Sequence, residues 1–198
     1  MFDEIRSQYF PAIVAPGITA KSVEIQTIRE VWDTISGQVF SSLAELGNYQ
    51  IPEERRHHSE RLNQIHQTAH KEYVIFYNAQ NEPIGWSFGV MIDPSTFFMS
   101  WTGILVEYQR RGIYTAFLKL FLPYLHALGY ERVTSNHMLN NRPVIIAKLK
   151  TGFYIEGIVL DERFGAQVAL VYLFHEDRRQ GFARAFSLET YHDEGMLV

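Results

Sequence analysis

The feature that most constrains the fold is the segment Gln109-Arg110-Arg111-Gly112-Ile113-Tyr114-Thr115-Ala116. It lies where an apolar, strand-like run ends and a strongly periodic helical run begins. A glycine-containing turn at such a junction leaves several backbone N–H groups without partners and directed to one place, and the helix dipole adds positive potential there. Arg110 and Arg111 add fixed positive charge. The segment therefore predicts a turn that binds phosphate.

Composition limits the class of protein further. The chain has 198 residues and is 46% hydrophobic, which suits a single globular domain over residues 1–198. It has no cysteine, which excludes disulfides, thiolate metal sites and a cysteine nucleophile. A formal charge of −4 argues against a nucleic-acid partner. No segment has the pattern of a signal peptide or a membrane span, so we expect a cytoplasmic protein without a membrane partner.

Hydrophobic periodicity and turn residues predict one α/β domain in the order β-α-α-β-β-β-α-β-α-β-β. Its core spans 18–174, and a charged tail covers 175–198. The expected strands are 18–25, 71–77, 84–92, 97–106, 131–137, 153–160 and 166–174. The expected helices are one whose apolar residues run from Ile28 to Leu46, one over 53–70 and one over 113–128, with a shorter one that begins at Asn141 and stops before Gly152. The second helix is mostly polar, with Leu62, Ile65 and Ala69 as a thin buried stripe.

This order, together with two local motifs, resembles the GNAT superfamily of acyl-CoA-dependent N-acetyltransferases. The pyrophosphate signature of that family, Gln/Arg-x-x-Gly-x-Gly/Ala, corresponds to Gln109 through Tyr114. Its second motif, an asparagine that opens the next helix and a Gly-Phe that closes it, corresponds to Asn141 and to Gly152-Phe153. The resemblance implies a mixed, mostly antiparallel sheet of about seven strands with helices on both faces.

The resemblance also implies where acetyl-CoA binds. In this family the strand before the signature parts from the strand after it, and the pantetheine arm lies in the gap against strand backbone. A backbone amide there also stabilises the oxyanion, an effect worth ~3–4 kcal/mol. The residues implied to bind acetyl-CoA are Thr102, Gly103, Ile104, Gln109, Arg110, Arg111, Gly112, Ile113, Tyr114, Thr115 and Asn141.

Two positions depart from the family pattern. Tyr114 replaces the second small residue of the signature, a change we expect to be tolerated because a side chain on the first helical turn can point away from the phosphates. Lys148 stands four residues before Gly152, where the family often has a tyrosine that protonates the departing thiolate. Lys148 either serves as this proton donor or projects into solvent near the helix end.

A base for the acceptor amine is harder to place, since the strand before the signature has neither a carboxylate nor a histidine. The next strand, 131–137, is unusually polar for a central strand, and buried polar side chains must be paired or line a cavity. His137 is therefore our candidate for a base or an acceptor-orienting group, with Asn136 beside it. The competing interpretation is that both are structural residues at a strand end.

The acceptor site is the least constrained part. Family resemblance places the loop between the first two helices over it, which makes Tyr49 a candidate contact, and Trp101 is a second. Aromatic residues at strand spacing are more often core residues, so that interpretation stays open for Trp101. His66 and His70 have the i, i+4 spacing of a metal pair, but no third ligand accompanies them, so we predict no metal.

These features predict an acetyl-CoA-dependent N-acetyltransferase acting on an amine of a small molecule or peptide by direct attack in a ternary complex. Enzymes of the same fold that use a longer acyl-CoA or another nucleophile are the nearest competing class. The other competing class is a catalytically degenerate domain that binds acyl-CoA as a sensor or structural module. The oligomeric state is left open, and a homodimer is compatible with the sequence.

Overall fold

A single eight-stranded sheet in the order β1-β2-β3-β4-β5-β6-β8-β7 forms the centre of the protein in the computed structural model, which describes residues 2–39 and 52–186. The strands are β1 (Ala12–Ala15), β2 (Ile18–Ser22), β3 (Lys71–Tyr77), β4 (Pro83–Asp93), β5 (Thr96–Ile104), β6 (Arg132–Met138), β7 (Tyr154–Asp161) and β8 (Gly165–Leu173). All neighbouring strands are antiparallel except β5 and β6, which are parallel.

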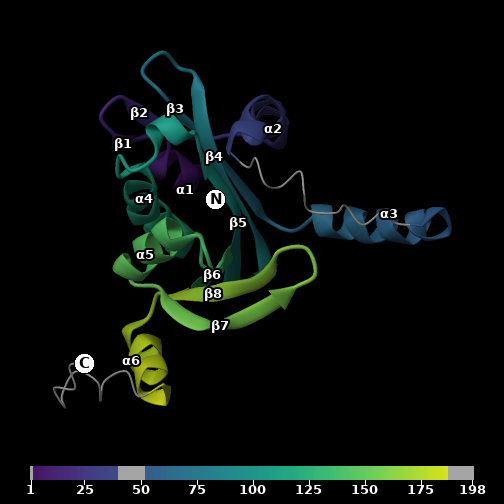
Figure 1. Ribbon diagram of the computed structural model, residues 1–198, viewed down its shortest axis with the longest axis vertical. Coiled ribbons are helices and arrows are strands. Elements are labelled where there is room, and N and C mark those ends of the chain that lie inside the picture. Colours follow the sequence, from purple (N-terminus) through teal and green to yellow (C-terminus); the bar gives the residue numbers. More distant parts are fainter. Residues whose placement is uncertain (1, 40–51, 187–198) are drawn as a thin grey trace.

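Helices cover both faces of this sheet (Figure 1). They are α1 (Phe2–Tyr9), α2 (Ile25–Val39), α3 (Glu53–Gln67), α4 (Ile113–Ala127), α5 (Arg142–Lys150) and α6 (Glu176–Ala185), with a 3₁₀ turn, η2 (Val106–Tyr108), before α4. α1, α4 and α5 lie on one face and α2 on the other, whereas α3 projects away from the sheet. None of the helices in the described ranges has both the length and the apolarity to cross a bilayer.

The core forms because α4 and the sheet bring their apolar faces together. Phe117 and Phe121 of α4 stack with ring centroids 4.8 Å apart. Phe76 of β3 meets the ring of Phe117 edge-on, and Phe97 of β5 meets that of Phe121 in the same way. All four side chains are buried, which removes the large apolar area of each ring from water.

The predicted order of elements is confirmed from β2 onward, and the predicted sheet needs one correction. It has eight strands rather than about seven, because residues 12–15 add a short strand at its edge. Two helices were also not predicted: α1 is short and buries no residue, and α6 lies in the segment predicted as a charged tail. Periodicity did not reveal them because both helices are short and mostly polar.

The second helix also differs in part from its prediction. α3 ends at Gln67, and Leu62 and Ile65 are more than half exposed, so the predicted buried stripe is wrong. α2 begins at Ile25, a residue predicted to end the preceding strand, and the last part of its predicted apolar stripe, to Leu46, lies outside the described residues.

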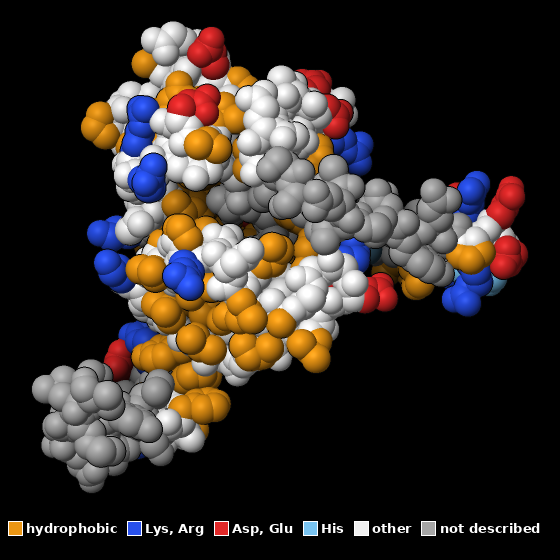
Figure 2. All heavy atoms as spheres, viewed as in Figure 1, with side chains coloured by type: hydrophobic (Ala, Val, Ile, Leu, Met, Phe, Trp, Pro, Cys, Tyr) orange, Lys and Arg blue, Asp and Glu red, His pale blue; other side chains and the backbone are white. Residues whose placement is uncertain are grey.

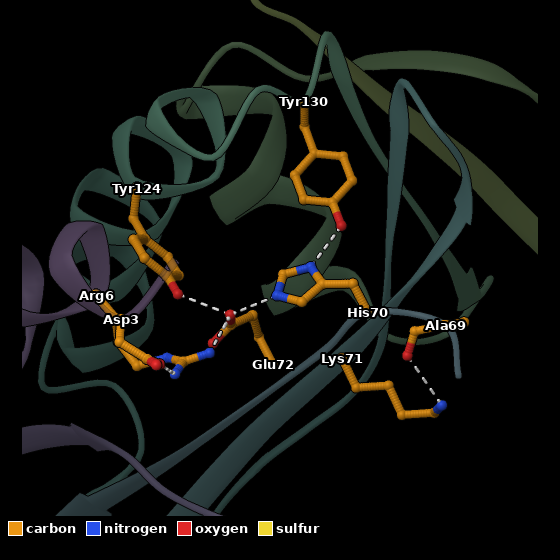
Figure 3. Close-up of polar contacts among 8 residues, drawn as sticks. All are labelled: Asp3, Arg6, Ala69, His70, Lys71, Glu72, Tyr124 and Tyr130. Atoms are coloured by element: carbon orange, nitrogen blue, oxygen red, sulfur yellow. Dashed lines mark hydrogen bonds and ion pairs between the residues drawn. The ribbon is translucent and has the colours of Figure 1, made fainter. Parts of the chain in front are cut away.

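A buried carboxylate holds α1 to the sheet (Figure 3). Glu72 of β3 is 1% exposed and accepts hydrogen bonds from Arg6 at 3.0 Å and from the Tyr124 hydroxyl at 2.7 Å. His70 lies 2.9 Å from the same carboxylate and 2.6 Å from the Tyr130 hydroxyl. Burial opposes the charge on Glu72, but its hydrogen bonds to His70, Arg6 and Tyr124 prevail and lower its pKa. The charge is therefore stabilised where it is buried.

Candidate active site

The strands β5 and β6 part after three pairs of residues. Their parallel register runs only from Thr96 opposite Arg132 to Phe98 opposite Thr134. β5 continues to Ile104, while β6 continues beside β8 to Met138. In the described part of the chain, β5 therefore has no strand partner on its β6 side beyond Phe98. This is the gap that the family resemblance implied.

A β-bulge lies where the gap begins. On β4, Phe88 is opposite Trp101 of β5 but the next residue, Gly89, is opposite Met99, so Ser100 is the extra residue. A bulge of this kind changes which face the following side chains occupy and bends the strand. Met99 thus faces α4 and α5, whereas Trp101 faces α2, where its ring meets that of Trp32 at 5.9 Å.

Two glycines let β4, β5 and α2 approach closely below the gap. A Cβ on Gly103 would lie 2.6 Å from Cγ1 of Val39 and 3.1 Å from the ring of Trp86. A Cβ on Gly85 would lie 2.4 Å from the carbonyl oxygen of Gly103. Real side chains do not approach this closely, so both positions require glycine for packing. Thr102 is held in the same register by a 2.8 Å hydrogen bond between its hydroxyl and that of Ser87.

The signature turn leads from the end of β5 into α4. Arg110 has φ 59° and Gly112 has φ 79°, so the backbone passes twice through the left-handed region. The Ala116 N–H donates to the Gly112 carbonyl at 3.0 Å as the first hydrogen bond of the helix. The amides of residues 113–115 precede that bond and have no acceptor within α4. Successive amides in such a turn form a concave anion site.

Charge and side chains around the turn suit the same ligand. Arg110 and Arg111 are exposed, and the Arg111 guanidinium lies 5.0 Å from the centre of the Tyr108 ring. Figure 2 shows Lys and Arg side chains spaced along the side of the molecule that carries α4 and α5. The Gln109 side-chain amide donates to the Ile104 carbonyl at 2.8 Å, which ties the turn to the end of β5.

Tyr114 does not obstruct this turn. Its side chain is partly buried and packs against the hydrophobic core, and burial raises its pKa. The open space above Gly112 is preserved, since a Cβ placed there would meet no heavy atom within 4 Å. The residues present therefore fit a pyrophosphate group.

Lys148 is completely buried, which rules out its projection into solvent. It is 0% exposed, and its Nζ donates to the Ser135 hydroxyl at 2.5 Å. Met99 Sδ lies 3.6 Å from Nζ, and the centre of the Phe153 ring lies 4.5 Å from it. Within the described ranges no carboxylate pairs with this amine. Burial lowers the pKa of Lys148 to about 7.

The same serine joins Lys148 to His137. The Ser135 Oγ lies 3.0 Å from Nε2 of His137. Burial and the nearby Lys148 lower the pKa of His137 to about 3, so its imidazole is neutral at ordinary pH. Asn136 lies between Ser135 and His137 on β6 and so faces the opposite side of the sheet. Of the three residues predicted for catalysis, the structure brings Lys148 and His137 together but not Asn136.

Three further residues were predicted to contact the cofactor or the acceptor, and they lie in different places. Asn141 is the residue before α5, as predicted, and its exposed side chain makes no capping hydrogen bond. Trp101 is partly exposed, and its ring contacts those of Trp32 and Phe164. Tyr49 lies outside the described residues.

The histidines predicted at metal spacing are not on one helix face. α3 ends at Gln67, so His70 lies beyond it, and both of its ring nitrogens contact Tyr130 or Glu72. Among residues 2–39 and 52–186, no three His, Cys, Asp or Glu side chains are grouped so that they could hold a metal ion.

Sequence reasoning missed one member of the site, Ser135. The polarity of residues 132–137 was the available signal, because Thr, Ser, Asn and His in succession are unusual in a central strand and indicate a polar site there. That signal identified the strand but not the partner, since Lys148 comes from a different element.

Comparison with known proteins finds likeness at the level of structure. No protein-family model and no curated protein sequence matches the chain. The spermidine N-acetyltransferase from Vibrio cholerae in complex with CoA and spermine superimposes with a TM-score of 0.56 at 15% identity, over 80% of this chain and 96% of that one.

Two further structures of the Vibrio cholerae enzyme agree. One in complex with manganese ions gives a TM-score of 0.56 at 16% identity, over 87% of this chain and 99% of that one. A dodecameric form superimposes with a TM-score of 0.57 at 16% identity, over 80% of this chain and 94% of that one. Together with the parting of β5 and β6 and the signature turn, these similarities show that the chain has the fold of the GNAT superfamily of N-acetyltransferases.

Proposed function

We propose that the protein is an N-acetyltransferase that moves the acetyl group of acetyl-CoA to an amine by direct attack in a ternary complex. The observation that supports this most is the parting of β5 and β6 at Phe98, with the anion-binding turn at Gly112 beyond the end of β5. An extended thioester arm in the gap would meet unpaired β5 backbone at Thr102 and Gly103. Its pyrophosphate would meet the amides of residues 113–115.

Gln109 has a defined part in donor binding. Its side-chain amide now bonds the Ile104 carbonyl, one of the groups expected to pair with the pantetheine arm. When that arm binds, the amide is released for the phosphates, so one hydrogen bond is exchanged for another. The buried Ser87–Thr102 hydrogen bond keeps β5 in place meanwhile.

Lys148 is the proposed proton donor to the departing thiolate. Its Nζ contacts Met99, the first β5 residue beyond the parallel pairing, so it lies at the closed end of the gap. A pKa of about 7 populates both its charged and neutral forms at physiological pH, which suits a group that gives and regains a proton. His137, neutral in this environment, is proposed to orient the acceptor by hydrogen bonding.

The acceptor is proposed to be a primary amine of a small molecule, with its chain beside Trp101 and its nitrogen in the gap between β5 and β6. Spermidine and spermine are the first to test, because the similar structures are named for spermidine and one holds spermine. Trp101 is partly exposed between Trp32 and Phe164, so its ring can contact an aliphatic or cationic chain. Trp101→Ala should raise KM for the amine and leave the affinity for acetyl-CoA unchanged.

The experiment is release of free CoA thiol on incubation with acetyl-CoA and a panel of polyamines, amino acids, aminoglycosides and peptides. Turnover with one acceptor class supports the enzyme. Tight acetyl-CoA binding with no thiol release from any acceptor would contradict it and favour the sensor. Longer acyl-CoA donors in the same assay test the acyl group. Sedimentation of the protein determines its oligomeric state, for which a homodimer is compatible with the sequence.

A further inference from the structure

A continuous hydrogen-bonded chain of three side chains links the buried end of the gap to its edge. Lys148 Nζ lies 2.5 Å from Ser135 Oγ, which lies 3.0 Å from His137 Nε2. Lys148 and Ser135 are both 0% exposed, whereas His137 is partly exposed. His137 stands three residues beyond Thr134, the last β6 residue paired with β5, so it borders the open part of the gap.

The reaction under "Proposed function" creates a need for such a chain. When a neutral amine attacks a thioester, its nitrogen becomes positively charged and must lose a proton. The departing thiolate must gain one. Both atoms are bonded to the same tetrahedral carbon, so one proton has to leave the nitrogen while another reaches the sulfur. A hydrogen-bonded chain that accepts a proton at one end and gives one up at the other balances both.

We propose that Ser135 is a relay residue that carries the acceptor's proton from His137 to Lys148, an inference that rests on the proposed function. The amine nitrogen bonds to the carbonyl carbon and gives its proton to Nδ1 of His137. Nε2 passes its proton to Oγ of Ser135, and Oγ passes its own to the neutral Nζ of Lys148. The C–S bond then breaks, and Nζ gives a proton to the sulfur. The enzyme ends with as many protons as it had.

The groups around Lys148, Ser135 and His137 fit proton transfer along these three side chains. Nδ1 of His137 has no hydrogen-bond partner in the described part of the chain, so it is available to the acceptor. Among the described residues, the Lys148 amine also lies beside the Met99 thioether and the Phe153 ring, neither of which can take its proton. The lowered pKa of His137 disfavours a trapped imidazolium, which favours passing the proton on. His137 is the titratable group that faces Lys148 from β6.

Ser135→Ala tests the relay, with Ser135→Thr as the variant that keeps the hydroxyl. Thr134→Val is the matched control, since the adjacent Thr134 is also buried but its Oγ1 has no partner in the described ranges. Ser135→Ala should lower kcat about 10²-fold and flatten the pH profile near neutrality, with acetyl-CoA affinity unchanged. Ser135→Thr should recover most of the rate, and Thr134→Val should keep it.

A second measurement does not depend on turnover. Titration of the Lys148 amine by NMR should show its pKa lowered in Ser135→Ala, because the ammonium loses its acceptor, and unchanged in Thr134→Val. An unaltered titration in Ser135→Ala, or a wild-type rate in that variant, would overturn the relay. A wild-type protein that acetylates no amine in the panel would instead refute the proposed function.

Discussion

Replacing Lys148 by methionine should change how stability depends on pH. In the folded protein burial lowers the pKa of this amine from 10.5 to about 7, whereas the unfolded chain keeps the ordinary value. Between these values the unfolded state binds a proton that the folded state does not, so stability rises with pH. At ~1.4 kcal/mol per pH unit, the full effect is roughly 5 kcal/mol, of which about 2–3 kcal/mol falls between pH 7 and 9.

Methionine fills nearly the same volume without a charge, so Lys148→Met should lose this slope. It should also be more stable than the wild type near pH 6, where the folded wild type carries a buried ammonium. Lys150→Met is the control, because Lys150 lies on the same helix and is exposed. Urea unfolding at pH 6, 7, 8 and 9 measures all three proteins. This pH range ends below the ordinary pKa of tyrosine, ~10, so tyrosine ionisation does not contribute to the slope.

The result that would refute this reasoning is a wild-type stability that changes with pH no more than that of Lys148→Met. Such a result would mean that the Lys148 amine is solvated in the folded protein. Its assignment as a proton donor of neutral pKa would then fall as well. A slope lost equally in Lys150→Met would assign the effect to general surface charge instead.

Further outcomes follow from the packing. Gly103→Ala should destabilise by ~1–3 kcal/mol in chemical denaturation, because its Cβ would lie 2.6 Å from Val39, whereas Gly157→Ala, with open space around it, should stay within about 0.5 kcal/mol. Glu72→Gln should cost ~2–3 kcal/mol at neutral pH, because Arg6 loses its buried carboxylate partner and keeps only the exposed Asp3. Glu72 has a lowered pKa, so it stabilises the fold above pH 4.5 and this contribution disappears as the pH falls below that value; acid unfolding of Glu72→Gln should be correspondingly less steep.

Elements with a strong apolar period could be predicted from the sequence. α4 and the strands β3, β4, β5, β7 and β8 have such patterns. The glycine at position 112 has a positive φ, which a glycine in a turn between strand and helix suggests. α1 could not be found in this way, because its apolar residues are few and its Arg6 side chain bonds a carboxylate 66 residues away. Ion pairs between distant residues leave no periodic signal.

The candidate site shows the same division. The backbone part of it, the gap and the turn, follows from local patterns and the order of elements. The Lys148–Ser135–His137 chain depends on how α5 lies over β6, which spacing alone does not define. The burial of Lys148 is the clearest case, because a lysine near a helix end is ordinarily solvated. Its full burial and its contacts with Ser135, Met99 and Phe153 show otherwise.

Calorimetric titration with acetyl-CoA, in the wild type and in Gly112→Asp, tests the central assignment most directly. Aspartate tolerates the left-handed backbone better than most residues, and the space above Gly112 is open, so the variant should fold. Its carboxylate would place negative charge where the pyrophosphate is expected. We expect saturable binding to the wild type and loss of binding in Gly112→Asp. A wild type that does not bind acetyl-CoA, or a variant that binds it equally well, would contradict the assignment.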